Sequence, residues 1–136
     1  MKILAIDYGE RRTGLAVSDD LGITAQGLDT LVVKDEGELP GLITETVRKL
    51  KVERILLGLP RNMNGSEGEQ CAKVREFGDA LGHDTEIPVV YWDERMTSLQ
   101  AQRVMLELGT GTRGNKHAVD RIAATLMLQE YLSSLP

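Results

Sequence analysis

The amino-acid sequence predicts an α/β fold with one mixed, five-stranded sheet, in which three antiparallel strands precede two parallel ones and helices cover both faces. Three strand-like segments follow one another near the start, too close together for helices between them. After them, helical and strand-like segments alternate. The chain has 136 residues, the usual size of one domain, and it contains no linker or internal repeat, so we expect a single domain over 1–136.

The strands are predicted from short apolar runs that end in turn residues. The first run stops at Asp7, which Tyr8 and Gly9 follow as a turn, and the next two runs stand at hairpin distance. The expected strands are 2–6, 13–18, 27–33, 54–57 and 89–92.

The helices are predicted from a 3.6-residue apolar period and from start signals. Ser66 with Glu69, and Thr97 with Gln100, each have the spacing of a capping box, which opens a helix. The expected helices are 39–50, 66 to about 81, 97 to about 108, and about 116–132.

Composition narrows the class of protein. Hydrophobic residues make up 41% of the chain, enough for one packed core, and no apolar run approaches the ~18 residues of a membrane span. The first residues lack the features of a signal peptide, and the single cysteine, Cys71, is expected in the core. We therefore expect a cytoplasmic domain with no membrane partner.

A net charge of −5 counts against a nucleic-acid partner, because the protein as a whole repels phosphate. Bound cations and local arginines at an acidic site can nevertheless bind phosphate groups.

Carboxylates stand where predicted strands end or a helix begins. Asp7 ends the first strand, Asp93 and Glu94 end the fifth, and Asp120 lies early in the last helix. Divalent ions such as Mg²⁺ prefer oxygen ligands, and ions held by carboxylates can cleave phosphodiesters. Each acid also has an ordinary interpretation, as a turn residue, a solvated charge or a helix-terminal charge. Strand alternation sends Asp93 and Glu94 to opposite faces, so only one of them should reach a shared site.

Asp120 has surroundings that favour a site. At 100° per residue it shares a helix face with Ala123, Ala124, Met127 and Tyr131, so we expect this face to lie on the sheet. An unpaired charge there would be costly.

Basic residues fall in loops or at element ends near these acids. Arginine suits bidentate phosphate contact, although solvated surface is the ordinary alternative for each one. The candidates for nucleic-acid binding are Arg12, Arg61, Arg95, Arg113 and Lys116. The segment 109–114 spells G-x-G-x-x-G, but a helix rather than a strand is expected before it, which argues against a dinucleotide site.

Four motifs in series resemble the YqgF/RuvX family over essentially the whole chain. They are Asp7-Tyr8-Gly9 with 12–19, 58–60 with 64–66, 93–97, and Val119-Asp120 with Ala123-Ala124. The resemblance implies an RNase H-like fold related to Holliday-junction resolvases. It also implies a nuclease that resolves such junctions or matures the 5′ end of precursor 16S ribosomal RNA.

Carried over by motif, the family's acids fall on Asp7, on the Asp93–Glu94 pair and on Asp120. We favour Glu94 within the pair, which gives Asp7, Glu94 and Asp120 as ligands of Mg²⁺ or Mn²⁺. RuvC resolvases have a second acid three residues further along the last helix, where this chain has Ala123. That departure weakens the case for full two-metal catalysis.

Three functions are consistent with these residues. The first is a metal-dependent endonuclease acting on structured RNA or branched DNA, with ribosome association as a further expectation. The second is a non-catalytic nucleic-acid or ribosome-assembly module with a degenerate site. The third, an actin-like phosphotransferase, needs two lobes where 136 residues supply one. No feature separates RNA from DNA, or a monomer from a homodimer.

Overall fold

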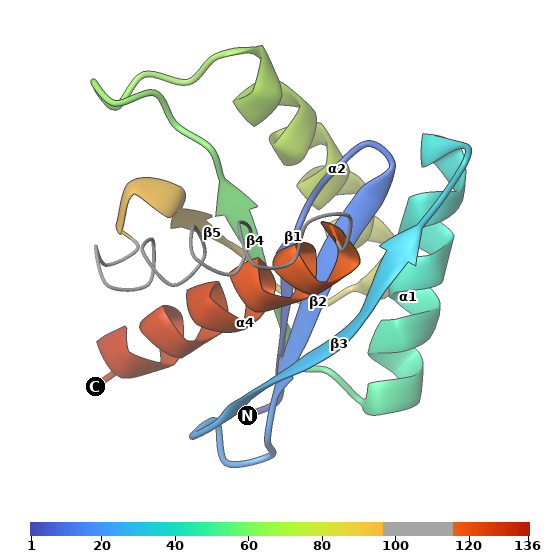
Figure 1. The fold of residues 1–136 in the computed structure, drawn as a ribbon. Helices are drawn as coiled ribbons and strands as arrows, with labels where there is room; N and C mark the ends of the chain where they lie inside the picture. The colour runs from blue at the N-terminus through green and yellow to red at the C-terminus, as the bar shows by residue number, and fades with distance from the viewer. Residues whose placement is uncertain (97–115) are drawn as a thin grey trace.

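The computed structural model describes residues 1–96 and 116–136 (Figure 1). Its elements are β1 (Ile3–Asp7), β2 (Arg12–Ser18), β3 (Ala25–Val32), η1 (Glu36–Glu38), α1 (Leu39–Leu50), β4 (Arg54–Leu59), α2 (Glu69–Thr85), β5 (Val89–Asp93), η2 (Glu94–Met96) and α4 (Lys116–Ser134). The strands and α-helices follow the predicted order through β5 and again at α4, and two short 3₁₀ helices, η1 and η2, were not predicted. The predicted helix at 97–108, the glycine-rich segment 109–114 and Arg113 lie outside the described residues.

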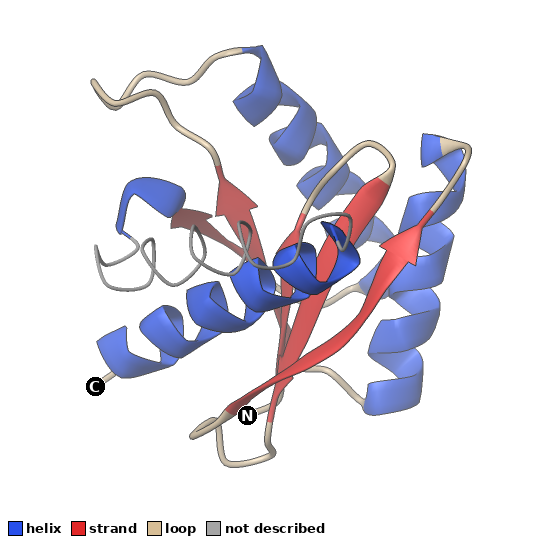
Figure 2. Cartoon of the chain, in the orientation of Figure 1, coloured by secondary structure: helices blue, strands red, loops and turns tan. Residues whose placement is uncertain are grey.

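The five strands form one sheet in the order β3-β2-β1-β4-β5 (Figure 2). The pairs β1–β2 and β2–β3 are antiparallel, whereas β1–β4 and β4–β5 are parallel. The predicted mixed sheet is confirmed, and β1 is its central strand.

Helices cover both faces of this sheet, as predicted. In Figure 1, α4 crosses one face and α1 and α2 lie on the other. Side chains on β1 alternate accordingly: Leu4 and Ile6 are buried with α1 and α2, and Ile3 and Ala5 are buried with α4. Burial of a large apolar side chain contributes about 1.5–3 kcal/mol, so both layers stabilise the sheet. The next residue in the α4-facing series is Asp7.

The buried side chains of α4 lie on the helix face that the projection predicted to contact the sheet. Ala124, Met127 and Tyr131 are all buried against the sheet, whereas Arg121 and Gln129 are exposed. The small side chain of Ala124 lets the helix approach the strands closely.

One predicted helix start is wrong. Helix α2 begins at Glu69 with Gly68 as its N-cap, and no side chain caps it. The Ser66 hydroxyl instead donates to Oδ1 of Asn64 at 2.6 Å and accepts from Nδ2 of Asn62 at 3.0 Å. Ser66 is thus part of the preceding loop, because a nearby asparagine offers its side chain a competing partner. Helix α2 also continues beyond residue 81, to Thr85.

Two further expectations can be compared with the described residues. Cys71 is fully buried in the core, as predicted. Within residues 1–96 and 116–136, no helix has the length and apolar character needed to cross a membrane.

Candidate active site

Asp7 stands at the carboxyl end of the central strand, on the face that α4 covers. Burial, followed by the negative charges of Glu94 and then Asp120, raises the pKa of Asp7 to about 7. Three carboxylates from distant parts of the chain therefore share one electrostatic environment. The structure brings together the three acids that the sequence proposed as metal ligands.

Gly14 explains how Asp120 comes so close to Asp7. Gly14 pairs directly with Asp7 across the β1–β2 ladder. A Cβ on Gly14 would stand only 2.1 Å from the carbonyl oxygen of Asp120 and 3.3 Å from the Asp120 Cβ. The backbone of α4 rests on the backbone of β2 at this point, and only glycine leaves the space.

Gly58 has the corresponding place on the other side of Asp7. It follows Leu57, which pairs with Ile6 of β1. A Cβ on Gly58 would lie 2.7 Å from Oε1 of Glu94 and 3.0 Å from Sδ of Met127. The short turn η2 after β5 thus returns the Glu94 carboxylate over β4, next to Asp7. Burial, followed by the charge of Asp93, raises the pKa of Glu94.

Neither Gly14 nor Gly58 was predicted as a site residue. Their importance depends on the strand register, which places one glycine on each side of Asp7. The available signal was their position inside segments predicted as a strand and a strand end, where glycine often marks a close approach.

Asp93 has a different environment from Glu94. The Arg95 side chain donates from Nη2 to Oδ2 of Asp93 at 2.7 Å and from Nε to both carboxylate oxygens at 3.1 Å. The Arg95 hydrogen bond holds the pKa of Asp93 below its usual value. The two neighbouring acids thus separate, with Glu94 beside Asp7 and Asp93 beside arginines.

Arg12 is bonded to one acid of the cluster, Asp120. Its Nε donates to Oδ2 of Asp120 at 2.9 Å. The Arg12 side chain is 37% exposed and that of Asp120 is 22% exposed, so solvent reaches the pair. A residue proposed to meet phosphate is therefore already bonded to a candidate metal ligand.

Arg61 and Arg95 belong to a chain of ion pairs behind Asp93. Arg61 approaches Glu67 at 3.4 Å and Asp93 at 3.9 Å. Arg75 of α2 holds Glu67 through two hydrogen bonds of 2.7 and 2.8 Å. Arg95 also donates to the carbonyl oxygen of Met63 at 3.3 Å. These contacts fasten the loop before α2 to the end of β5.

Lys116, another proposed phosphate contact, is the first residue of α4.

The donor set suits a hard divalent cation, although the acids are not arranged as a finished metal site. Among residues 1–96 and 116–136, no three His, Cys, Asp or Glu side chains are close enough together to hold an ion. Asp120 is instead paired with Arg12. The charges of Glu94 and Asp120 nevertheless oppose the ionisation of Asp7, and a bound dication would relieve that repulsion. Asp7, Glu94 and Asp120 are the residues that could hold one.

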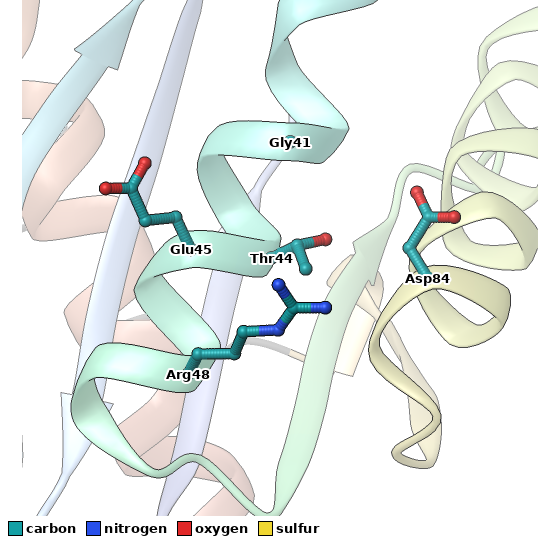
Figure 3. A pocket seen from close by; sticks show the side chains of 5 residues that line it. All are labelled: Gly41, Thr44, Glu45, Arg48 and Asp84. Carbon is teal, nitrogen blue, oxygen red and sulfur yellow. The ribbon is translucent and has the colours of Figure 1, made fainter.

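A hollow lies on the other face of the sheet, between α1 and α2 (Figure 3). In the figure, Thr44 and Arg48 of α1 point toward Asp84 of α2. Because α1 and α2 cover the face opposite α4, this open polar groove is separate from the acid cluster.

Solved structures place this architecture among known folds. The chain resembles Thermus thermophilus RuvC in complex with a Holliday junction substrate, with a TM-score of 0.63, 21% identity and coverage of 98% of this chain and 95% of that one. It also resembles the fowlpox virus Holliday junction resolvase, with a TM-score of 0.56, 14% identity and coverage of 99% and 100%. The protein is therefore of the RNase H-like, RuvC type in its fold.

Sequence relatives identify the family. The RuvX family, described as Holliday junction resolvase, matches residues 1–134, and the chain belongs to it. A relative from Agathobacter rectalis is 46% identical over 99% of this chain and 96% of its own length. One from Caldanaerobacter subterraneus is 45% identical over 98% and 97%. Both carry the name "Putative pre-16S rRNA nuclease".

Proposed function

We propose that this protein is a divalent-metal-dependent endonuclease that processes the 5′ end of precursor 16S ribosomal RNA in the cytoplasm. The observation that carries the proposal is the site around Asp7, where Glu94 and Asp120 add their charges to a carboxylate that is already desolvated. Such a cluster of acids is costly in its fully ionised form unless a cation neutralises it. The RuvX membership and the names of the relatives support nuclease chemistry.

The proposed roles follow from the positions of the side chains. Asp7, Glu94 and Asp120 would hold Mg²⁺ or Mn²⁺. The bound ion would supply Lewis-acid stabilisation to the phosphodiester under attack by water. Asp7 must lose its proton to serve as a ligand, and its raised pKa sets that loss near neutral pH. Arg12 would meet the phosphate charge, because a guanidinium matches two phosphate oxygens at once.

The choice of RNA rests on sequence similarity. The relatives named for precursor 16S RNA are 45–46% identical to this chain, whereas the RuvC structure bound to a junction is 21% identical. Branched DNA is the second candidate substrate, favoured by the description of the RuvX family.

A non-catalytic RNA-binding module is the competing function. Two observations favour it: Ala123 stands where RuvC resolvases have a further acid, and Arg12 already occupies Asp120. This alternative predicts RNA binding without metal and no cleavage under any condition.

The experiment is a cleavage assay on precursor 16S RNA that carries its 5′ extension, with a four-way DNA junction in parallel. We expect the RNA to be cut in Mg²⁺ and to remain intact in EDTA. Asp7→Asn should abolish cutting. Asp29→Asn is the matched control, because Asp29 is fully exposed and pairs only with Arg121 among the described residues. Cleavage by Asp7→Asn at the wild-type rate would refute the mechanism, and cleavage of the junction alone would refute the choice of RNA.

A further inference from the structure

The ion pair between Arg12 and Asp120 joins the first strand residue of β2 to the beginning of α4. It consists of one hydrogen bond, from Nε of Arg12 to Oδ2 of Asp120 at 2.9 Å. Within residues 1–96 and 116–136, this is the only hydrogen bond that the Arg12 side chain makes. The two Nη nitrogens of Arg12 thus have donors to spare for another acceptor in this part of the molecule.

The two partners of this pair differ in their freedom to move, because the backbone of Asp120 is held close to the sheet and the Arg12 side chain is long. The backbone of Asp120 rests on Gly14, where even a methyl group has no room. Arg12 has a long side chain that is 37% exposed. Exposed ion pairs contribute little to stability, so the guanidinium can leave Asp120 at small cost.

Two cations compete for the same carboxylate. An ion bound among Asp7, Glu94 and Asp120 would draw on the Asp120 carboxylate, one of whose oxygens Arg12 now holds. A guanidinium and a dication at neighbouring positions also repel each other. A phosphodiester offers Arg12 an alternative anion with two oxygens, which the guanidinium can bind as a fork.

We propose that Arg12 exchanges partners when substrate binds. In the free protein it holds Asp120 and weakens metal binding. A bound phosphodiester draws the guanidinium away and releases Asp120 to the metal. This inference rests on the proposed function, since it assumes that Asp120 is a metal ligand. It makes metal and substrate binding mutually reinforcing, because coupling between two sites is reciprocal.

The test is the affinity of the free protein for Mn²⁺ alone, measured by electron paramagnetic resonance without nucleic acid. Arg12→Gln should bind Mn²⁺ about tenfold more tightly than the wild type, which corresponds to about 1.4 kcal/mol. The matched control is Arg11→Gln, which removes an equal charge from the exposed neighbouring residue and should leave the affinity unchanged. Equal or weaker Mn²⁺ binding by Arg12→Gln would overturn the proposal.

A second measurement tests whether Arg12 binds the substrate. In EDTA, where the proposed function predicts no cleavage, Arg12→Gln should bind a precursor 16S RNA fragment several-fold more weakly than Arg11→Gln does. Thermal unfolding verifies that each variant is folded. If Arg12→Gln is not folded, Arg12→Met replaces it; methionine has no charge to pair with Asp120 and should give tighter Mn²⁺ binding in the same direction.

Asp120→Asn separates the two possible failures. If Asp120→Asn abolishes Mn²⁺ binding and Arg12→Gln brings no gain, the exchange is wrong and the proposed metal site stands. If the wild type and all variants fail to bind Mn²⁺, both the exchange and the metal-dependent function are wrong.

Discussion

The carboxylate of Glu94 lies directly over Gly58, so close that a Cβ on Gly58 would stand 2.7 Å from Oε1. Gly58 follows Leu57, the partner of Ile6 in β1, and on the opposite side of β1 Gly14, the partner of Asp7, lies under the backbone of Asp120. Because these two glycines have no side chains, Glu94 and Asp120 can approach Asp7. This arrangement leads to different predictions for the two glycines.

Gly58→Ala should damage activity more than stability. The added methyl group meets Oε1 of Glu94 and Sδ of Met127, both at the ends of flexible side chains that can shift. We expect a loss of about 1–2 kcal/mol in the free energy of unfolding, and a fall of at least about tenfold in cleavage rate as Glu94 moves. Denaturant unfolding and the RNA cleavage assay measure the two effects. An unchanged cleavage rate would show that the position of Glu94 is unimportant.

Gly14→Ala should damage stability itself. Its methyl group meets the Asp120 carbonyl oxygen, so the start of α4 must move off the sheet. We expect a loss of about 3 kcal/mol or more. Gly41→Ala is the control: it lies in α1 with no atom within 4 Å of the added Cβ, and it should stabilise the protein by about 0.5–1 kcal/mol. Equal effects of the two substitutions on thermal unfolding would contradict the close contact.

The raised pKa of Asp7 predicts a pH-dependent stability in metal-free buffer. The group titrates near 3.8 when unfolded and near 7 when folded. Between these values the folded protein binds a proton that the unfolded chain does not, so this residue makes stability fall as the pH rises. The full penalty, at most about 4 kcal/mol, applies above pH 7.

Asp7→Asn should therefore be more stable than the wild type at pH 8 in EDTA, and the difference should shrink as the pH falls toward 5. Unfolding in urea at several pH values measures it. A difference that stays constant with pH would show that Asp7 is not the titrating group.

The separation of Glu94 from Asp93 predicts unequal effects of their amides. Glu94→Gln removes a proposed metal ligand and should lower the cleavage rate at least about a hundredfold. Asp93→Asn weakens its bonds to Arg95 and should leave substantial metal-dependent cleavage, with weaker RNA binding. Rates measured across a range of Mg²⁺ concentrations distinguish the two. A larger loss in Asp93→Asn would reverse the assignment.

Most of the fold could be predicted from the sequence, because local apolar patterns and turn residues indicate most of its strands and helices. Helix α1 spans Leu39–Leu50 as its apolar period predicts. The start of α2 was wrong because the capping pattern at Ser66 takes no account of Asn64, which engages that side chain first.

Less of the candidate site than of the fold could be predicted from the sequence. Alternation indicated that Asp93 and Glu94 diverge, but the turn η2 determines which of them returns to Asp7. The roles of Gly14 and Gly58 depend on the register of β1 with β2 and β4, which single segments do not contain. The bond between Arg12 and Asp120 joins residues 108 positions apart and follows only from the packing of α4 on the sheet.

Anomalous X-ray diffraction from crystals soaked in Mn²⁺ tests the central claim, that the three acids form one metal site. We predict a peak among Asp7, Glu94 and Asp120, about 2.0–2.4 Å from at least two of their carboxylate oxygens. The peak should be absent from Asp7→Asn crystals soaked in the same way. A wild-type crystal that binds Mn²⁺ elsewhere and leaves this cluster without a peak would contradict the account.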